Sequence, residues 1–411
     1  MEAIPLLEQR RILLGITGGI AAYKVCSLAS HLTQAGAQVD VVMTEAATRF
    51  VAPLTFEALT GRPTYTSMWR RSGDGLPTHI AHVGLAHAAD LLVIAPATAN
   101  TMAKLAQGVA DNLLTTLALA ARCPLLLAPA MDVGMWAHPA TQANVAGLRG
   151  RGVAFAGPVR GRMASGLEGE GRMVEPDEIL GHVRRVLGRD GPLAGRRVVV
   201  SAGPTEEPFD PVRFLSNPSS GRQGFALSQA AVDRGAEVTL VAGPTHLGTP
   251  VGVERVDVRT AAEMKDAVLE ASAAADVLLM AAAVSDYGPA EAAAQKMKKG
   301  TQDLTLRLTR RPDILAAVKR ERAVTGRPQV VVGFAAETED LVANACQKLE
   351  AKRLDLIVAN DITLADAGFG VETNRVVLLE PDGKATELPL MSKSAVARRV
   401  LDRVEDLLKE A

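Results

Sequence analysis

Charged residues in the second half of the chain have the types and spacing to bind a polyphosphate. The run KMKK, residues 296–299, follows AAAVSDY, which is placed like the end of a strand. Lys348 and Lys352 are four residues apart, so they share one face of a predicted helix. A run such as KMKK is most often a solvated surface feature, but this combination favours a phosphate cradle. Asp286 and Asp313 could hold Mg²⁺ between phosphate oxygens, because Mg²⁺ prefers carboxylate ligands.

A long loop, residues 201–224, lies where a doubly wound sheet holds phosphate on backbone amides at a helix N-terminus. A strand-like run, residues 197–200, precedes it and a helix-like segment follows. The loop is far longer than such a turn requires, and it contains Pro, Asp, Arg and Asn side chains. Long insertions in a compact domain are usually functional or disordered. The loop is therefore a second candidate for chemistry.

The first half carries small and polar residues just past predicted strand ends. Gly18 and Gly19 form a turn between a strand and a helix, while Thr44, Thr98 and Asn100 follow two other strands. A tight turn and a helix cap explain the glycines and Thr98 about equally well. Because the three polar residues converge on one rim, they favour a phosphate site. GITGG lacks the dinucleotide spacing, so a mononucleotide or flavin phosphate fits better than NAD.

Near-continuous apolar runs predict the buried strands that position these residues, because central parallel strands are covered on both faces. The predicted strands are residues 11–16, 39–44, 90–98, 123–131, 197–200, 237–245, 277–284, 330–336, 354–360 and 375–380. Helical segments lie between them, one of which is expected to be capped by Asp111 or Asn112. The glycine-rich residues 157–172 have no apolar period and predict a mobile loop or lid.

The pattern of strand, glycine loop and helix restarts after a segment rich in Gly and Arg, residues 188–197. We therefore expect an α/β fold with two doubly wound, mainly parallel-sheet Rossmann-like domains, residues 1–190 and 191–411. The chain is long enough for two domains that each have their own core.

Composition narrows the class of protein. The chain has 45 basic and 46 acidic residues and a net charge of -1, so nothing indicates a nucleic-acid partner. Its 3 cysteines are widely spaced, which argues against a disulfide framework or a zinc site. No targeting or membrane-spanning segment is recognisable. We expect a cytoplasmic protein that binds small molecules.

Ten short motifs, in one order over nearly the whole chain, resemble a known family. The segments LGITGGIAAYK, MTEAA, APATANT, PAMDVGMW and ASGLEGEGRM look like the flavin-containing cysteine decarboxylases. The segments SAGPTEEPFDPVRFLSNPSSG, AAAVSDY, KMKK, GFAAET and DLIVAND look like phosphopantothenoylcysteine synthetase. Together they resemble the bacterial bifunctional enzymes of coenzyme A biosynthesis.

For the first half, the resemblance implies an FMN-dependent phosphopantothenoylcysteine decarboxylase. The rim residues would hold FMN: Gly18, Gly19, Thr44, Thr98 and Asn100. HVGLAHAAD satisfies the family's histidine pattern through His82, whereas His79 lies one helical turn too early. A histidine exchanges protons near neutral pH, so His82 is the expected acid/base.

Two positions of the first half depart from the family. Asp132 replaces an Asn that grips the substrate carboxylate, beside Met135 and Trp136 of the same motif. An ionised Asp would repel that carboxylate unless it were held protonated or its role passed to Arg160, Arg162 or Arg172. Ser165 replaces a Cys that protonates the enethiol intermediate in many family members, and a hydroxyl is the weaker acid. Carboxylate binding by Asp132 and final protonation by Ser165 are the predicted roles.

For the second half, the resemblance implies a CTP-dependent phosphopantothenate-cysteine ligase. The positions that match the family's nucleotide and substrate site are Asp286, Lys296, Asp313, Phe334, Lys348 and Lys352. Asn217 matches a residue placed against the acyl cytidylate and Arg213 a neighbouring family arginine, although Asn217-Pro218 is also ordinary turn chemistry. Asn217 and Lys296 are the expected catalytic residues, and Asp286 is the expected metal ligand.

The resemblance also implies the partners: CTP, 4'-phosphopantothenate, L-cysteine and 4'-phosphopantothenoylcysteine. Family members form trimers through the flavin domain, pairs through the ligase domain, and assemblies up to a dodecamer. Two alternatives stay open. The first half could be a flavin-binding scaffold with little activity, given Asp132 and Ser165. The chain could also be an NAD(P)-linked reductase, which the glycine spacing disfavours.

Overall fold

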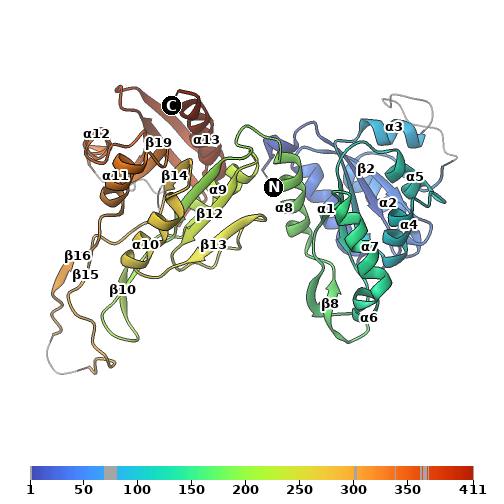
Figure 1. The fold of residues 1–411 in the computed structure, drawn as a ribbon, viewed down its shortest axis with the longest axis horizontal. Helices are drawn as coiled ribbons and strands as arrows, with labels where there is room; N and C mark the ends of the chain where they lie inside the picture. Colours follow the sequence, from blue (N-terminus) through green and yellow to red (C-terminus); the bar gives the residue numbers. More distant parts are fainter. Residues whose placement is uncertain are drawn as a thin grey trace. The chain divides into compact units, whose positions relative to one another are not determined.

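The computed structural model describes residues 2–68, 81–299, 303–337, 339–361, 363, 368 and 370–410. The chain divides into two compact units, Met1–Gly188 and Arg189–Ala411 (Figure 1). Each unit is a sheet with helices packed on both faces, which confirms the predicted α/β class. None of the helices in the described part of the chain is long and apolar enough to cross a membrane.

Six parallel strands form the sheet of unit 1, in the order β3-β2-β1-β4-β5-β6. They are β1 (Arg11–Ile16), β2 (Gln38–Met43), β3 (Thr64–Tyr65), β4 (Leu91–Ala97), β5 (Leu125–Pro129) and β6 (Ala154–Phe155). All seven residues of β4 are buried, as expected for a strand covered on both faces. Because the strands are parallel, their carboxyl ends share one edge.

The helices of unit 1 cover the two faces of its sheet. They are α1 (Ala22–Gln34), α2 (Pro53–Thr60), α3 (Ala81–Ala88), α4 (Ala99–Gln107), α5 (Leu113–Ala120), α6 (Val133–Ala137), α7 (Pro139–Gly150) and α8 (Pro176–Gly188). Helices α1, α2 and α8 contribute to one core, and α3, α4, α5 and α7 to the other. Asn112 caps α5 with its side chain, which decides between the two predicted capping residues.

The sheet of unit 2 has eight strands in the order β13-β12-β9-β14-β17-β18-β19-β20. They are β9 (Arg197–Ala202), β12 (Glu237–Ala242), β13 (Val253–Asp257), β14 (Val277–Met280), β17 (Val330–Glu337), β18 (Leu356–Asp361), β19 (Thr373–Leu379) and β20 (Ala385–Ser392). The pairs β18-β19 and β19-β20 are antiparallel and the other pairs are parallel. The mainly parallel, doubly wound prediction is confirmed.

The helices of unit 2 also divide between two faces. They are α9 (Arg222–Val232), α10 (Ala261–Ser272), α11 (Ile314–Thr325), α12 (Leu341–Lys352) and α13 (Lys393–Glu410). Helices α9 and α13 pack into one core, and α10, α11 and α12 into the other. Both groups therefore approach the carboxyl edge of the strands from opposite sides.

Two small antiparallel ribbons extend from unit 2, and we call them the arm. One pairs β10 (Glu206–Pro208) with β11 (Phe214–Ser216), and the other pairs β15 (Tyr287–Pro289) with β16 (Leu308–Arg310). Figure 1 shows β10, β15 and β16 projecting beyond the large sheet. Ala293 N donates to Phe209 O at 2.9 Å, which joins the two ribbons. The long loop predicted after β9 is thus partly ordered as a ribbon.

The prediction of a mobile loop or lid over residues 157–172 is wrong about its structure, because the segment is a β-ribbon. Strands β7 (Val159–Arg162) and β8 (Glu168–Arg172) pair antiparallel. The ribbon docks on the end of β5, where Met131 N donates to Gly171 O at 3.0 Å. A Cβ on Gly171 would lie 2.4 Å from Met131 O. Glycine at this position lets the two backbones approach closely. In the sequence, a glycine with this role looks the same as a glycine in a loop, which explains the wrong prediction.

Candidate functional site

A cavity of about 800 Å³ lies at the carboxyl edge of the unit 2 sheet. Residues that follow β9 and β14 line it, and so do residues at the ends of β17 and β18. This edge is where open α/β sheets bind ligands. Among the described residues that line the cavity, six side chains are basic and two are acidic. The charge favours an anionic ligand.

Six residues predicted from the sequence line this cavity: Asn217, Asp286, Asp313, Phe334, Lys348 and Lys352. They come from separate elements. Asn217 follows β11, Asp286 precedes β15, and Phe334 belongs to β17. Folding therefore brings together residues that are up to 135 positions apart, as the strand-end argument predicts.

The two lysines of α12 lie in different electrostatic settings. Lys352 forms an ion pair with Asp313, the cap of α11, whose other carboxylate oxygen accepts from Ala316 N at 2.9 Å. Burial alone would raise the pKa of Asp313, but Lys352 and this N–H group lower it below its usual range. Lys348 donates to Phe334 O at 2.8 Å, and burial lowers the pKa of its ammonium. Lys348 is thus a partly buried cation of the cradle.

The carboxylates of Asp286 and Asp313 could hold a metal ion only if a bound substrate supplied further oxygen ligands. Asp313 already uses both of its oxygens, with Lys352 and Ala316 N. Within the described residues there is no group of three or more His, Cys, Asp or Glu side chains that could hold a metal. Mg²⁺ is commonly bound by one or two carboxylates and substrate phosphates, and Asp286 in the cavity wall can supply that one carboxylate.

The side chain of Asn217 is held in place at the cavity wall. Its Nδ2 donates to Ala283 O at 3.1 Å, and Ala283 N in turn donates to Gly203 O at 2.9 Å. Thr205 reinforces this contact, since its Oγ1 accepts from Ser285 N at 2.9 Å. The long loop is therefore tied to the end of β14, and the amide of Asn217 has one fixed orientation.

The structure does not bring Arg213 and Lys296 to the cavity wall. Arg213 lies in the arm, where Nη2 donates to Met297 O at 2.7 Å. Lys296 is adjacent to Met297 and, like Arg213, is absent from the residues that line the cavity. The two residues are instead neighbours of each other, joined through one backbone carbonyl.

Asp210 is the residue that organises this part of the arm, and the sequence reading missed it. Its carboxylate is buried and accepts from Val212 N and Arg213 N, both at 2.8 Å, and from Met297 N at 3.2 Å. Burial alone would raise its pKa, but these three N–H groups and Arg213 lower it. Asp-Pro is a turn signature that could have indicated it. Asp210 thus holds the segments of Arg213 and Lys296 together.

We expect Asp210→Asn to loosen the arm, because an amide NH₂ would face backbone N–H groups that now meet a carboxylate. Amide hydrogen exchange at Val212 and Met297 should become roughly 10-fold faster or more. This factor corresponds to the net free energy of about one lost hydrogen bond. Lowering the pH should do the same in the wild type, measured as exchange relative to the intrinsic amide rate at each pH. The pKa of Asp210 is lower in the folded chain than in the unfolded chain, so ionised Asp210 stabilises the fold at pH values above its unfolded pKa. This stabilisation is lost as the pH falls through its folded pKa. Asp303→Asn, at an exposed position of the arm, is the control. Unchanged exchange in Asp210→Asn would contradict the assignment.

The predicted rim of unit 1 lies at the carboxyl edge of its sheet. Gly18 and Gly19 connect β1 to α1, Thr44 follows β2, and Thr98 follows β4. A Cβ on Gly18 would lie 2.4 Å from the Cβ of Ala46, so this glycine is required for packing. No side chain caps the first turn of α1. Its backbone N–H groups can therefore receive a phosphate, which fits a mononucleotide cofactor.

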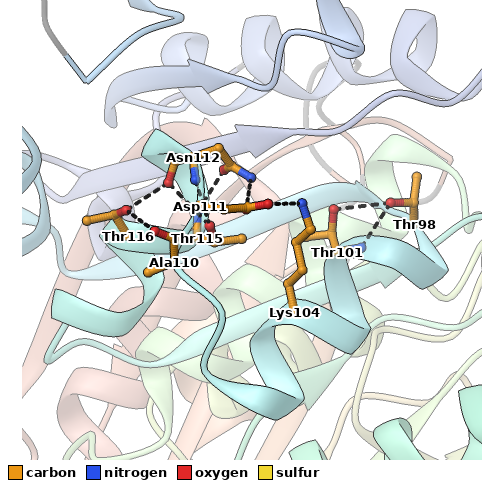
Figure 2. Close-up of polar contacts among 8 residues, drawn as sticks. All are labelled: Thr98, Thr101, Lys104, Ala110, Asp111, Asn112, Thr115 and Thr116. Carbon is orange, nitrogen blue, oxygen red and sulfur yellow. Dashed lines mark hydrogen bonds and ion pairs between the residues drawn. The ribbon is translucent and has the colours of Figure 1, made fainter.

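Thr98 and Asn100 frame the next part of the rim. Thr98 caps α4 by accepting from Thr101 N at 3.3 Å, and Asn100 is exposed in the first helical turn. Figure 2 shows how the far end of α4 is tied to α5, through the ion pair of Lys104 with Asp111 at 2.6 Å. The hydrogen bond from Lys104 lowers the pKa of Asp111. The helix that Thr98 caps is thus tied to the residues that precede α5.

Asp132 and Ser165, the two departures from the family pattern, contact each other. Ser165 Oγ donates to Asp132 Oδ2 at 2.7 Å, and Asp132 Oδ1 accepts from Gly134 N at 3.1 Å as the cap of α6. Met135, on α6, is about half exposed. The ribbon β7-β8 therefore carries Ser165 onto the cap of α6. Arg172, on the same ribbon, is paired with Glu175 at 2.6 Å.

The predicted acid/base lies outside what the structure describes. His82 is in α3, but its side chain is outside the described residues, and so is His79. The remaining rim positions are described, and they share one edge of the sheet with Asp132.

Comparison with known proteins agrees with this two-part architecture. Residues 5–188 match the family model described as "Flavoprotein", and residues 193–408 match "DNA/pantothenate metabolism flavoprotein C-terminal domain". The chain is 45% identical over 408 residues to the "Coenzyme A biosynthesis bifunctional protein CoaBC" of Bacillus subtilis, covering 98% of this chain and 99% of the relative. The chain belongs to this family of bifunctional coenzyme A biosynthesis proteins. It is a bifunctional enzyme with a ligase and a decarboxylase activity.

Further members of the CoaBC family and two solved structures are similar. The Mycobacterium tuberculosis protein is 45% identical over 411 residues, covering 97% of each chain. A crystal structure of the C-terminal domain of a CoaBC protein covers 54% of this chain and 100% of that chain, with 38% identity and a TM-score of 0.46. The structure of a mutant PPC decarboxylase complexed with pantothenoylaminoethenethiol covers 43% and 97%, with 36% identity and a TM-score of 0.40.

Proposed function

We propose that residues 191–411 join 4'-phosphopantothenate to L-cysteine at the expense of CTP. The observation that carries this proposal is the basic cavity at the strand ends, whose wall contains Asn217, Asp286 and Lys348. A carboxylate oxygen of phosphopantothenate attacks the α-phosphorus of CTP, and pyrophosphate leaves. The amine of cysteine then attacks the acyl carbon of the cytidylate, CMP leaves, and 4'-phosphopantothenoylcysteine is formed.

The six predicted residues that line the cavity have roles in this reaction. Lys348 and Lys352 neutralise the triphosphate, and Asp286 would hold Mg²⁺, which would neutralise further phosphate charge. Asp313 positions Lys352 through their ion pair. Phe334 lines the cavity beside Lys348, which is fixed to the Phe334 carbonyl. Asn217 donates to the acyl cytidylate as an uncharged amide, which cannot attack the anhydride. Lys296 as a catalytic residue and Arg213 as a substrate contact act from the arm, since neither lines the cavity.

We propose that residues 1–190 decarboxylate 4'-phosphopantothenoylcysteine to 4'-phosphopantetheine, with FMN held at the rim of Gly18, Gly19, Thr44, Thr98 and Asn100. Bound FMN would supply the reversible oxidation that makes loss of CO₂ possible. His82 would exchange the proton during this oxidation. Asp132 and Met135 contact the substrate, and Ser165 gives the final proton, its hydroxyl oriented by Asp132 at 2.7 Å.

A flavin-binding scaffold is the second candidate for unit 1, and the same hydrogen bond favours it. Asp132 is an anionic side chain that already accepts from Ser165 and Gly134 N, so it offers no donor to a substrate carboxylate. Purified protein should absorb near 450 nm, on the order expected for bound flavin, under either candidate. Release of CO₂ from the cysteine conjugate separates them.

We expect Asp132→Asn to lower the KM for 4'-phosphopantothenoylcysteine by roughly 10-fold, because an amide donates to the carboxylate where an ionised Asp repels it. The amide keeps an oxygen for the α6 cap, so flavin absorbance should not change. Initial rates of CO₂ release give the KM, and Asp177→Asn, at an exposed position of α8, is the control. An unchanged KM would mean that position 132 does not face the carboxylate.

We further propose that the chain works as a homo-oligomer, with trimeric flavin domains, dimeric ligase domains and a dodecamer as the full assembly. The three free cysteines fit a reducing compartment, and we propose the cytoplasm. Sedimentation of the intact chain tests the assembly.

A further inference from the structure

Lys393 is a buried lysine in the cavity wall, and none of the roles above uses it. It is the first residue of α13 and is only 7% exposed. Its Nζ donates to Gly368 O at 3.0 Å, and within the described residues this is its one hydrogen-bond acceptor. An ammonium has three donors, and the described residues supply no acceptor for the other two. Lys393 lines the same cavity as Lys348.

Three features of its position disfavour a positive charge. The group is buried, it lies at the N-terminal end of a helix dipole, and Arg222 is a neighbouring cation. Burial and Arg222 lower the pKa of Lys393. Glu372 acts in the opposite direction, but its carboxylate is already paired with Arg222 at 2.9 Å. An anion bound in the cavity would offset the free-energy cost of keeping Lys393 charged.

The first turn of α9 faces the same part of the cavity. Gly221, Arg222 and Gln223 line it, and no side chain caps this helix. Gly221 has a φ of 79°, a conformation that favours glycine. Gln223 Nε2 donates to Lys393 O at 3.2 Å and so ties the starts of α9 and α13 together. Open backbone N–H groups and two cations therefore converge.

This group is separate from the phosphate cradle of α12. Helices α9 and α13 belong to one core of unit 2, and α12 belongs to the other. Lys393 and Lys348 thus approach the strand ends from opposite faces of the sheet. A cavity with cations on both sides suits two anionic groups at once.

We propose that Lys393, with Arg222 and the first turn of α9, binds a phosphoryl group of a substrate. The inference rests on the proposed ligase function and adds a binding residue to it. Two substrates of that reaction carry phosphoryl oxygens, the triphosphate of CTP and the phosphomonoester of 4'-phosphopantothenate. The chemistry of recognition is the same for both, and binding measurements separate them.

The test is calorimetric titration of the full chain with CTP and Mg²⁺, with 4'-phosphopantothenate, and with pantothenate, which lacks the phosphate. In Lys393→Met, the affinity for the substrate that places its phosphoryl group here should fall by about 10-fold to 100-fold, the value of a charge-assisted contact. The affinity for pantothenate should stay the same. Lys393→Arg should retain most of the binding. Lys409→Met, at an exposed position of the same helix, is the matched control.

The melting temperature of the ligand-free protein excludes a merely structural role. If Lys393 mainly held Gly368, its replacement by Met would lower the melting temperature. If it awaits an anion, Lys393→Met should melt at the same temperature as the wild type or above it. Unchanged affinities for CTP and phosphopantothenate, or an equal loss for pantothenate, would overturn the inference. In that case amide formation by the wild type would still support the ligase, whereas failure of the wild type to bind either substrate would overturn both.

Discussion

Asn217→Asp should reduce amide formation by roughly 100-fold to 1000-fold, the effect of losing one preorganised donor at a reacting carbonyl. In the wild type, Asn217 Nδ2 donates to Ala283 O at 3.1 Å, which orients the amide in the cavity wall. An aspartate would face that carbonyl oxygen with a negative charge, and it would repel both the substrate carboxylate and the triphosphate. The loss should appear mainly in kcat, because Asn217 acts on the cytidylate.

Pyrophosphate release and amide product should be measured together. In steady state we expect both to fall in Asn217→Asp, because every turnover passes through the cytidylate on which Asn217 acts. Asn344→Asp is the control, since Asn344 is exposed on α12 and does not line the cavity. If Asn217→Asp formed amide at the wild-type rate, the long loop would have no part in the reaction.

Lys348→Met should weaken CTP binding by about 10-fold to 100-fold, because it removes a charge-assisted contact to the triphosphate. Lys348 is held by Phe334 O at 2.8 Å, so little freedom is lost when it meets a phosphate. Calorimetric titration with CTP and Mg²⁺ measures the change. Lys319→Met is the control, since Lys319 also donates to a backbone carbonyl, Ala351 O at 2.9 Å, but does not line the large cavity. Equal CTP affinities for Lys348→Met and the wild type would remove Lys348 from the site.

The pH dependence of CTP binding follows from the same lysine. Burial lowers the pKa of Lys348, and Lys352 adds to this, while Glu337, Asp286 and Asp313 oppose it. As the pH rises through the lowered pKa of Lys348, its ammonium loses its proton. The affinity for CTP should therefore fall at a lower pH than it would with a lysine of ordinary pKa. The ligand-free fold has the opposite dependence. It binds fewer protons than the unfolded chain between the two pKa values, so its stability rises with pH there. Lys348→Met should abolish both dependences.

The sequence predicted the large elements because burial on both faces leaves a clear apolar signal. Strands β4, β5 and β14 are such runs, and the structure confirms them. The short ribbons carry no such signal. Strands β10 and β11 have three residues each, and β7 and β8 are rich in Gly and charged residues, so their pairing depends on distant contacts. Local pattern cannot reveal a contact such as Met131 N with Gly171 O.

The candidate site was predictable where a side chain follows a strand end or repeats along a helix. Lys348 is found in this way and Asn217 by its match to a family motif, and both line the cavity. Asp210 and Lys393 were not predictable from spacing. Asp210 accepts from backbone N–H groups 87 positions away in the case of Met297, and Lys393 reaches the cavity only because α9 and α13 share a face of the sheet. Their importance comes from tertiary structure.

The most direct test of the account is the mass of the product formed from 4'-phosphopantothenate, L-cysteine, CTP and Mg²⁺ by the purified chain. We expect 4'-phosphopantetheine, with pyrophosphate, CMP and CO₂ released in equal amounts. Accumulation of 4'-phosphopantothenoylcysteine without CO₂ would confine the activity to unit 2 and leave unit 1 as a scaffold. Recovery of unchanged phosphopantothenate, with no pyrophosphate, would contradict the proposed ligase activity.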